Sequence, residues 1–268
     1  MIHKKVMPIL VLLLLLFNVM QVDAQCKLTN TAFESGEEIK YDLYMNLGIF
    51  NARAGRGLLS VTEANYRGDD AYKLVMMFNT SGLAGNIYSV NDTLTSFVDK
   101  SLRPLLFTKE AAEGKDYSVD RQSYTYEGDK VKIRSFRVRN GKEQFDEVNT
   151  LEHCTYDYLS VLPYIRNLDY TGMQTGDRLH IHFIAGKKPV NMYVNYDGIS
   201  KVKANNGKKY EVINITLTIL DDAFENQKKA LKASLTNDEN RIPVIIDTTL
   251  KFGAIRAVLK STSGTRNP

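Results

Sequence analysis

Residues 231–260 read LKASLTNDENRIPVIIDTTLKFGAIRAVLK and alternate between apolar and polar side chains. Val244 and Ile246 are apolar, whereas Asp247 has the opposite parity, which is the period of two expected of a strand with one buried face. Beyond Gly253 the apolar positions become odd-numbered, so this glycine predicts a bulge or bend at a sheet edge or barrel corner. The segment as a whole predicts a β-hairpin followed by a third strand.

The same alternation recurs along much of the chain. In residues 38–47 the apolar side chains share odd positions, at Ile39, Tyr41, Leu43, Met45 and Leu47. Antiparallel sheets with one wet face show this pattern, whereas parallel strands read as continuous apolar runs. Residues that tolerate positive φ separate the runs, in the turns predicted at Arg67-Gly-Asp-Asp, Glu127-Gly-Asp, Asn140-Gly, Asp197-Gly and Asn205-Asn-Gly.

One segment, residues 155–168, predicts a substantial helix. Its apolar side chains recur at spacings of three and four, at Tyr158, Leu162, Ile165 and Leu168. Asp157 falls in the first turn, where the helix dipole favours an acid, and Pro163 predicts a kink. The predicted fold class is therefore all-β and mainly antiparallel, with a long curved sheet or open barrel wrapped around one kinked helix. The apolar stripe of that helix is the candidate ligand groove.

Two stretches resemble the family of domain of unknown function 3108. They are SLTNDENRIPV at 234–244 with LKFGAIRAVL at 250–259, and GEEIKYDLYMNLGIFNARAGRG at 36–57, where an alternating strand leads into a glycine-rich one. The resemblance spans Phe33 to Lys260 and implies an exported bacterial protein. It implies no activity, cofactor or site residue.

The first 24 residues have the layout of a secretory signal peptide. Two lysines precede an apolar core that is too short to span a bilayer, and Val22 and Ala24 suit cleavage by a small-residue rule. Cys26 raises the alternative of a lipoprotein, but the residues before it make a poor lipid-attachment motif. We expect residues 25–268 to form a single β-rich domain, with two halves divided near 168–177 as the alternative, in the periplasm or associated with the outer membrane.

Charge excludes few functions. Removal of the first 24 residues takes away two lysines and one aspartate, leaving 33 basic and 30 acidic side chains. This balance does not indicate nucleic-acid binding, and no later segment is long and apolar enough to predict a transmembrane helix. Two cysteines, Cys26 and Cys154, predict a disulfide in an oxidising compartment; the alternative is a buried free Cys154.

No motif predicts catalysis, a cofactor or a metal site. His180 and His182 share one strand face, but no third ligand stands at ligand spacing, so ordinary exposed histidines are expected. The acidic pair Glu37-Glu38 is interpreted as a solvated turn. A basic stripe on one predicted hairpin is a candidate anion patch, or else an edge strand protected by charge; its members are Lys132, Arg134, Arg137 and Arg139, with Lys142 nearby.

The sequence leaves three functions open. The first is an exported, non-enzymatic envelope protein that binds an apolar or amphiphilic ligand, such as a lipid or glycan, or an envelope partner protein. The second is a structural or assembly factor without a small-molecule site. The third is a hydrolase whose site has no recognised motif. A cavity lined by Tyr, Met and Leu would favour the first, and an exposed apolar patch the second.

Overall fold

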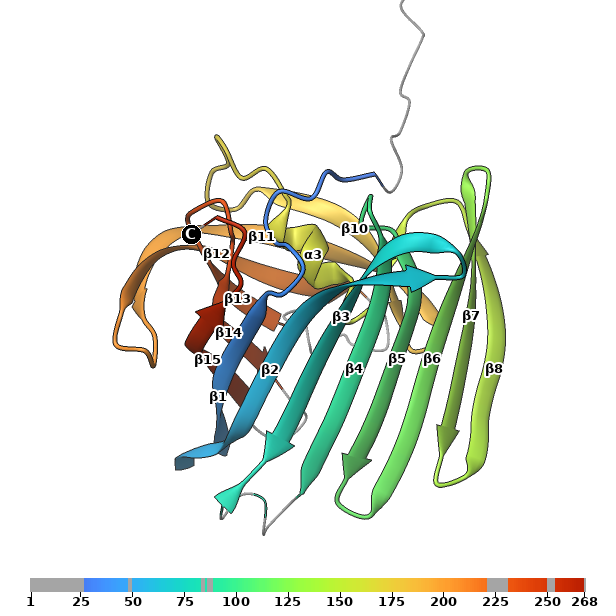
Figure 1. The fold of residues 1–268 in the computed structure, drawn as a ribbon, viewed down its shortest axis with the longest axis horizontal. Helices are drawn as coiled ribbons and strands as arrows, with labels where there is room; N and C mark the ends of the chain where they lie inside the picture. Colours follow the sequence, from blue (N-terminus) through green and yellow to red (C-terminus); the bar gives the residue numbers. More distant parts are fainter. Residues whose placement is uncertain are drawn as a thin grey trace, which may run out of the picture.

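A computed structural model describes residues 27–47, 50–82, 85, 89–220, 231–249 and 254–267. Within them, one sheet of 15 strands has the order β8-β7-β6-β5-β4-β3-β2-β1-β15-β14-β13-β12-β11-β10-β9 (Figure 1). Every pairing is antiparallel except that of β9 with β10. The elements are β1 (Glu38–Leu47), β2 (Phe50–Tyr66), β3 (Asp69–Thr80), β4 (Val90–Asp99), β5 (Pro104–Glu113), β6 (Asp116–Glu127), β7 (Lys130–Arg139), β8 (Lys142–Leu151), β9 (Thr155–Tyr156), α3 (Val161–Arg166), β10 (Arg178–Ala185), β11 (Lys188–Lys203), β12 (Lys209–Leu220), β13 (Leu231–Thr236), β14 (Pro243–Thr249) and β15 (Ala254–Ser263). The all-β class and the wrapped architecture predicted from the sequence are confirmed.

The two ends of the sheet meet by packing, so that the barrel is nearly closed. β8 and β9 are not paired with each other, but the β10–β11 turn lies against the inner face of β6–β8. The Gln122 amide donates to the Gly186 carbonyl at 2.7 Å, and the Asn149 amide donates to the Lys187 carbonyl at 3.0 Å. Ile184 packs with the buried side chains of β6 and β7 beside this contact.

The segment 231–260 contributes three strands, as predicted, but none of them lies at an edge. β14 is paired with both β13 and β15, and β15 is paired with β1. The predicted facing is confirmed where it is described, since Ile246 stands opposite Ala257 and Ala257 stands opposite Leu43. Gly253 lies outside the described residues.

Two of the predicted turns illustrate what local chemistry decides. Asn140 and Gly141 have φ values of 50° and 74° and join β7 to β8, as the Asn-Gly pair predicts. The turn predicted at Asp197-Gly is wrong, because both residues lie within β11, where the register against β12 shifts between Tyr196 and Gly198. The positive φ of Gly198, 94°, forms a β-bulge there instead of a hairpin.

The predicted helix is much shorter than 155–168. Thr155 and Tyr156 are extended because they pair with β10, and only Val161–Arg166 is helical. Between these elements the buried Asp157 carboxylate accepts hydrogen bonds from the Leu159 and Ser160 amides, which fixes a turn. Burial raises the pKa of Asp157, while these hydrogen bonds act to lower it.

The proline in this helix also has a different role from the predicted one. Pro163 is the third residue of α3, within the first turn, where a backbone N–H has no helical acceptor. Its position therefore requires no kink.

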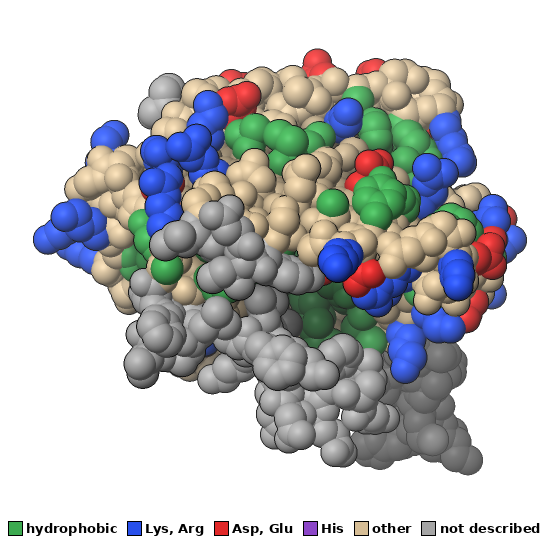
Figure 2. Space-filling model, turned by 90° about the horizontal axis from the view of Figure 1, so that it is seen from below, with side chains coloured by type: hydrophobic (Ala, Val, Ile, Leu, Met, Phe, Trp, Pro, Cys, Tyr) green, Lys and Arg blue, Asp and Glu red, His purple; other side chains and the backbone are tan. Residues whose placement is uncertain are grey.

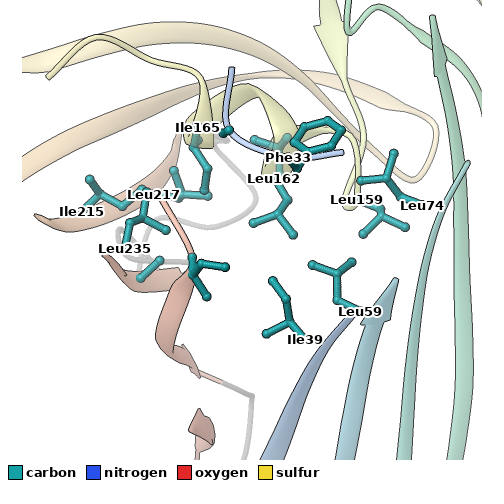
Figure 3. Close-up of a cluster of buried hydrophobic side chains, with 14 of the residues drawn as sticks. Phe33, Ile39, Leu59, Leu74, Leu159, Leu162, Ile165, Ile215, Leu217 and Leu235 are labelled. Carbon is teal, nitrogen blue, oxygen red and sulfur yellow. The ribbon is translucent and has the colours of Figure 1, made fainter. Parts of the chain in front are cut away.

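The helix closes one end of the barrel, which we call the plugged end. Side chains of α3 and of the preceding turn point toward those of the facing strands in Figure 3. The cluster includes Phe33, Ile39, Leu59, Leu74, Leu159, Leu162, Ile165, Ile215, Leu217 and Leu235. The opposite end, where β1 reaches Leu47 and β3 reaches Thr80, is the open end (Figure 1).

A buried ion pair holds the plug in place, where the plug is α3 with the turn before it. The Arg166 guanidinium donates to both carboxylate oxygens of Glu37, at 2.6 and 2.8 Å, and their side chains are 2% and 0% exposed. Arg166 also donates to the Asn240 and Ala32 carbonyls. The expectation that Glu37 is solvated in a turn is therefore wrong, because the fold supplies a cation far away in sequence.

Candidate functional site

One half of the barrel interior is apolar. In an antiparallel sheet, directly opposed residues project to the same face, so rows of side chains can be followed across the strands. From β1 to β11 one such row consists of Leu43, Ala257, Ile246, Ala233, Ile215 and Tyr196. Each of these residues belongs to the main core or packs against it. All of these side chains except Ile246 are buried, and together they make the inward face of this half continuous hydrocarbon.

The interior becomes charged on the other half. The row that begins with the core residues Leu59, Met76 and Leu94 on β2, β3 and β4 continues across β5, β6, β7 and β8 as Lys109, Asp120, Arg137 and Phe145. Because Leu94 faces the core, its cross-strand successors face the interior as well. We call Lys109, Asp120 and Arg137 the charged row.

The charged row is ion-paired within the sheet. Lys109 Nζ lies 3.3 Å from Asp92 Oδ2 and 3.1 Å from Glu113 Oε1. Arg137 makes a two-pronged contact with Asp120, with Nη2 2.6 Å from Oδ2. The local inventory is therefore two cations, Lys109 and Arg137, and three carboxylates, Asp92, Glu113 and Asp120.

The ion pairs favour the charged forms of Lys109 and Arg137 although both side chains are partly buried. Burial acts to lower the pKa of Lys109, but Asp92 and Glu113 raise it above its ordinary value. The hydrogen bonds that Arg137 donates to Asp120 likewise raise the pKa of Arg137. Burial raises the pKa of Asp92, and the neighbouring Lys109 opposes that rise.

Buried polar atoms without a hydrogen-bond partner lie on the same half of the sheet as the charged row. Among the described residues, the buried side-chain atoms without a hydrogen-bond partner are Asp92 Oδ1, Ser96 Oγ, Gln122 Oε1 and Ser135 Oγ. All four residues are on the inward face of β4, β6 or β7. Asp92 has the same parity as Leu94 on β4. The other three form one cross-strand row with Phe107, beside the charged row. Buried polar groups are nearly always satisfied, so this clustering is unusual.

Tyr158 faces the charged row from the plug. Its ring packs against Phe107 and Phe183, with centroid distances of 6.1 and 5.0 Å. Both phenylalanines are buried, yet Tyr158 is 50% exposed, so its accessible half faces the open interior. Burial raises the pKa of the phenol, with Arg137 acting to lower it and Asp120 to raise it, which places the hydroxyl within electrostatic reach of the charged row.

Among the described residues, the interior is less tightly packed toward the open end. Inward side chains near this end remain only partly buried, among them Met76, Phe78, Leu231 and Ile246. Figure 2 looks onto this end and shows hydrophobic side chains deep in a hollow, with Lys and Arg side chains along part of its rim. The hollow thus has an apolar wall, a charged wall and a mouth.

The four predicted groove residues are divided by the structure. Leu162 and Ile165 are buried in the main core, and Leu168 is half-buried against it. Tyr158 lies before α3 and faces the interior beside the charged row. Of the predicted stripe, Tyr158 is the residue whose accessible surface adjoins the hollow.

The predicted basic stripe is also divided, because its members differ in parity. Lys132 and Arg134 are on the outer face of β7, whereas Arg137 and Arg139 are on the inner face. Each is paired with an acid: their partners are Glu127, Asp146, Asp120 and Asp116, respectively. The alternative interpretation as an edge strand is wrong, since β7 is paired on both sides and β8 is the edge.

Three histidines meet on the outside of β10, one of them unforeseen. His182 stacks on His153 with ring centroids 4.2 Å apart and contacts His180 at 4.6 Å. Burial, His153 and His180 together lower the pKa of His182 to about 4. In the part of the chain that the structure describes, no group of three His, Cys, Asp or Glu side chains has an arrangement that could hold a metal ion.

Other features lie away from the hollow. Cys154 packs against the core, and Cys26 lies outside the described residues, so their disulfide stays a prediction. Two shallow depressions of about 420 and 520 Å³ adjoin the plugged end, where Asn240 and Asn267 hold the plug together. Across the described ranges, no helix has the length and apolarity needed to cross a bilayer.

Lys109 and Asp120 of the charged row were not identified from the sequence, whereas Arg137 was assigned to the basic stripe. A signal is present, because Lys109 shares its parity with the buried Phe107 and Ala111, and Asp120 shares its parity with the buried Gln122 and Tyr124. Polar residues at the parity of core residues mark an interior that is not packed with hydrocarbon alone.

One family model and two solved structures resemble this chain, and the first of the two structures agrees with the barrel architecture. The family model described as "Protein of unknown function (DUF3108)" matches residues 40–260. A crystal structure of a β-barrel-like protein of domain of unknown function DUF1849 from Brucella abortus superposes with a TM-score of 0.61 at 15% identity, covering 87% of this chain and 99% of that one. A putative exported protein with a YmcC-like fold from Bacteroides fragilis covers 89% of this chain and 100% of its own length, at 10% identity and a TM-score of 0.33. No curated protein is significantly similar to this chain.

Proposed function

The chain belongs to the DUF3108 family, and since that family's description assigns no activity, we propose a function from the barrel interior: the protein binds an amphiphilic molecule in the hollow. The apolar chain of the ligand lies on the wall formed by β1 and β10–β15, and its polar end faces the charged row. The protein acts without catalysis, as a binding protein of the cell envelope.

The observation that carries this proposal is the division of one interior into two chemically different walls. A barrel that served only as scaffold would fill its interior with packed side chains, as small barrels do. Here the plugged end is filled, whereas inward residues toward the open end keep accessible surface. Ligand sites are typically concave and mostly apolar, with a few placed polar groups.

The alternative of an assembly factor has less support. Such a protein would most simply offer its open edge, β8, to a partner strand. β8 carries Lys142, Glu143, Asp146 and Glu147 among its ten residues. Charged edges of this kind are protected against pairing rather than built for it.

The proposed location is the cell envelope, reached by export. It rests on the leader-like residues 1–24, which lie outside the described residues. Intact-mass measurement of protein from its native envelope tests it, with a mature chain expected to begin at Gln25 and to carry no acyl group. A chain that retained its leader, or that began at Cys26 with acyl chains, would contradict this processing.

Adjacent methionines allow a matched test of ligand binding. Met76 faces the interior between Leu59 and Leu94, whereas Met77 is 39% exposed on the outside. Because the chain contains no tryptophan, Met76→Trp and Met77→Trp each introduce a unique fluorophore. We expect 12-bromododecanol to quench the first variant strongly and saturably and the second weakly. Equal quenching of both variants, or none of either, would contradict binding in the hollow.

A further inference from the structure

The charged row and its neighbours define the polar end of the ligand. Resting on the proposed function, we infer that Asp92, Lys109, Asp120, Arg137 and Tyr158 form a head-group subsite that selects an uncharged, hydroxyl-bearing head over a carboxylate or phosphate. The subsite lies on β4–β7 and on the turn before α3.

The cations of the subsite already have partners. Lys109 contacts two carboxylates, and Arg137 makes two contacts with one. An anionic head would have to displace these carboxylates, and breaking a partly buried pair leaves a charge without compensation. With two cations against three carboxylates, the local field also opposes a further negative charge.

An uncharged head that carries hydroxyls fits the same groups without breaking the pairs. Asp92 is 7% exposed and its Oδ1 atom has no partner, so it accepts a hydrogen bond from any hydroxyl that reaches it. The Tyr158 hydroxyl, whose pKa is raised by burial, donates as well as accepts. A site with unsatisfied acceptors discriminates strongly in favour of ligands that supply donors.

The apolar neighbours set where the head ends and the chain begins. Met76 and Leu94 precede Lys109 in the same row, and Phe145 follows Arg137. A hydroxyl-bearing head at the charged row therefore leaves the start of the attached chain beside the hydrocarbon of β3 and β4, from which the chain continues onto the apolar wall of the proposed function. The interior in this way contacts both the polar head and the apolar chain of an amphiphile.

The test compares three ligands that share a twelve-carbon chain: monolauroylglycerol, laurate and dodecyl phosphate. Each is titrated into the Met76→Trp protein below its critical micelle concentration, with the change in tryptophan emission as the readout. We expect monolauroylglycerol to bind with a Kd about tenfold lower than that of either anion.

Variants show whether the charged row causes the preference. Asp120→Asn frees Arg137 and should lower the Kd of laurate by about tenfold, so that the preference is lost or reversed. The matched control is Asp247→Asn, which removes a carboxylate paired with Arg256 on the outer face of β14 and should leave all three Kd values unchanged. Circular dichroism confirms that each variant is folded. If Asp120→Asn does not fold, Asp92→Asn replaces it, with the same expected direction for laurate.

The outcomes separate this inference from the proposed function. If none of the three ligands binds saturably, the proposed function fails and the inference fails with it. If they bind but an anion binds most tightly, or if the preference survives in Asp120→Asn, or in Asp92→Asn where that variant replaces it, the head-group inference alone is overturned. Preference for monolauroylglycerol that is lost in these variants and kept in Asp247→Asn supports it.

Discussion

Removal of the Arg166 side chain should unfasten the plug. Arg166→Met retains the aliphatic stem near Phe33 but leaves the Glu37 carboxylate fully buried without its cation. A buried charge stranded in this way costs about 3–5 kcal/mol. The Ala32 and Asn240 carbonyls also lose a donor, each worth about 1 kcal/mol. We therefore expect a total loss of about 5–7 kcal/mol, comparable with the whole stability of many domains.

A double-mutant cycle shows whether the loss comes from the pair. Glu37→Leu combined with Arg166→Met removes both charges, so its free energy of unfolding should exceed that of Arg166→Met alone by about 2–3 kcal/mol. The assay is urea denaturation, with the slopes compared to confirm a common unfolded state. The control is Arg256→Met, which breaks a half-exposed pair with Asp247 and should cost about 1 kcal/mol or less.

Two results would refute this reasoning. A loss below about 1 kcal/mol for Arg166→Met would mean that Glu37 finds water or another donor, so that the pair is not sealed in the core. A double variant no more stable than Arg166→Met would mean that the stranded charge is not the cause. Either result would remove the ion pair as the fastening of the plug.

Three further changes probe other parts of the molecule. Leu162→Asp should cost more than about 3 kcal/mol in urea unfolding because it buries an unpaired carboxylate, whereas the volume-conserving Leu162→Met should cost less than about 1.5 kcal/mol. Since the folded state lowers the pKa of His182 to about 4, its contribution to stability is present above pH 6.5 and is lost toward pH 4; an NMR titration of His182 with a midpoint near 6.5 would contradict this. Non-reducing peptide mapping should find Cys26 linked to Cys154, and reduction should cost roughly 4–5 kcal/mol; two free thiols would exclude the bridge.

Alternation predicted the strands well because it reports a local property. Residues 231–249 and 254–260 form strands whose facing follows the apolar parity, since a half-buried strand shows its two faces in its own sequence. The helix was overestimated because only two of the four apolar residues that predicted it, Leu162 and Ile165, lie in α3; Tyr158 precedes it and Leu168 follows it. Tyr156 is drawn into the sheet by β10, and the turn at Asp157 is fixed by its own side chain. Such tertiary pairing is invisible to periodicity.

The charged row shows where parity becomes ambiguous. On β7, Val131 and Ile133 share a face with Arg137, whereas Phe136 shares the other face with Arg134, so the apolar pattern of the first half is lost in the second. The period of two shows which side chains of a strand share a face. Which of the two faces points into the barrel follows from the neighbouring strands. Leu94 points into the core, and the register from β4 across β5 and β6 to β7 therefore shows that Arg137 also points inward. For a strand with a polar sequence, the face that points into the barrel is therefore known only from its register with apolar neighbouring strands. Its charged side chains can be proposed as ligand-binding residues only once that register is known.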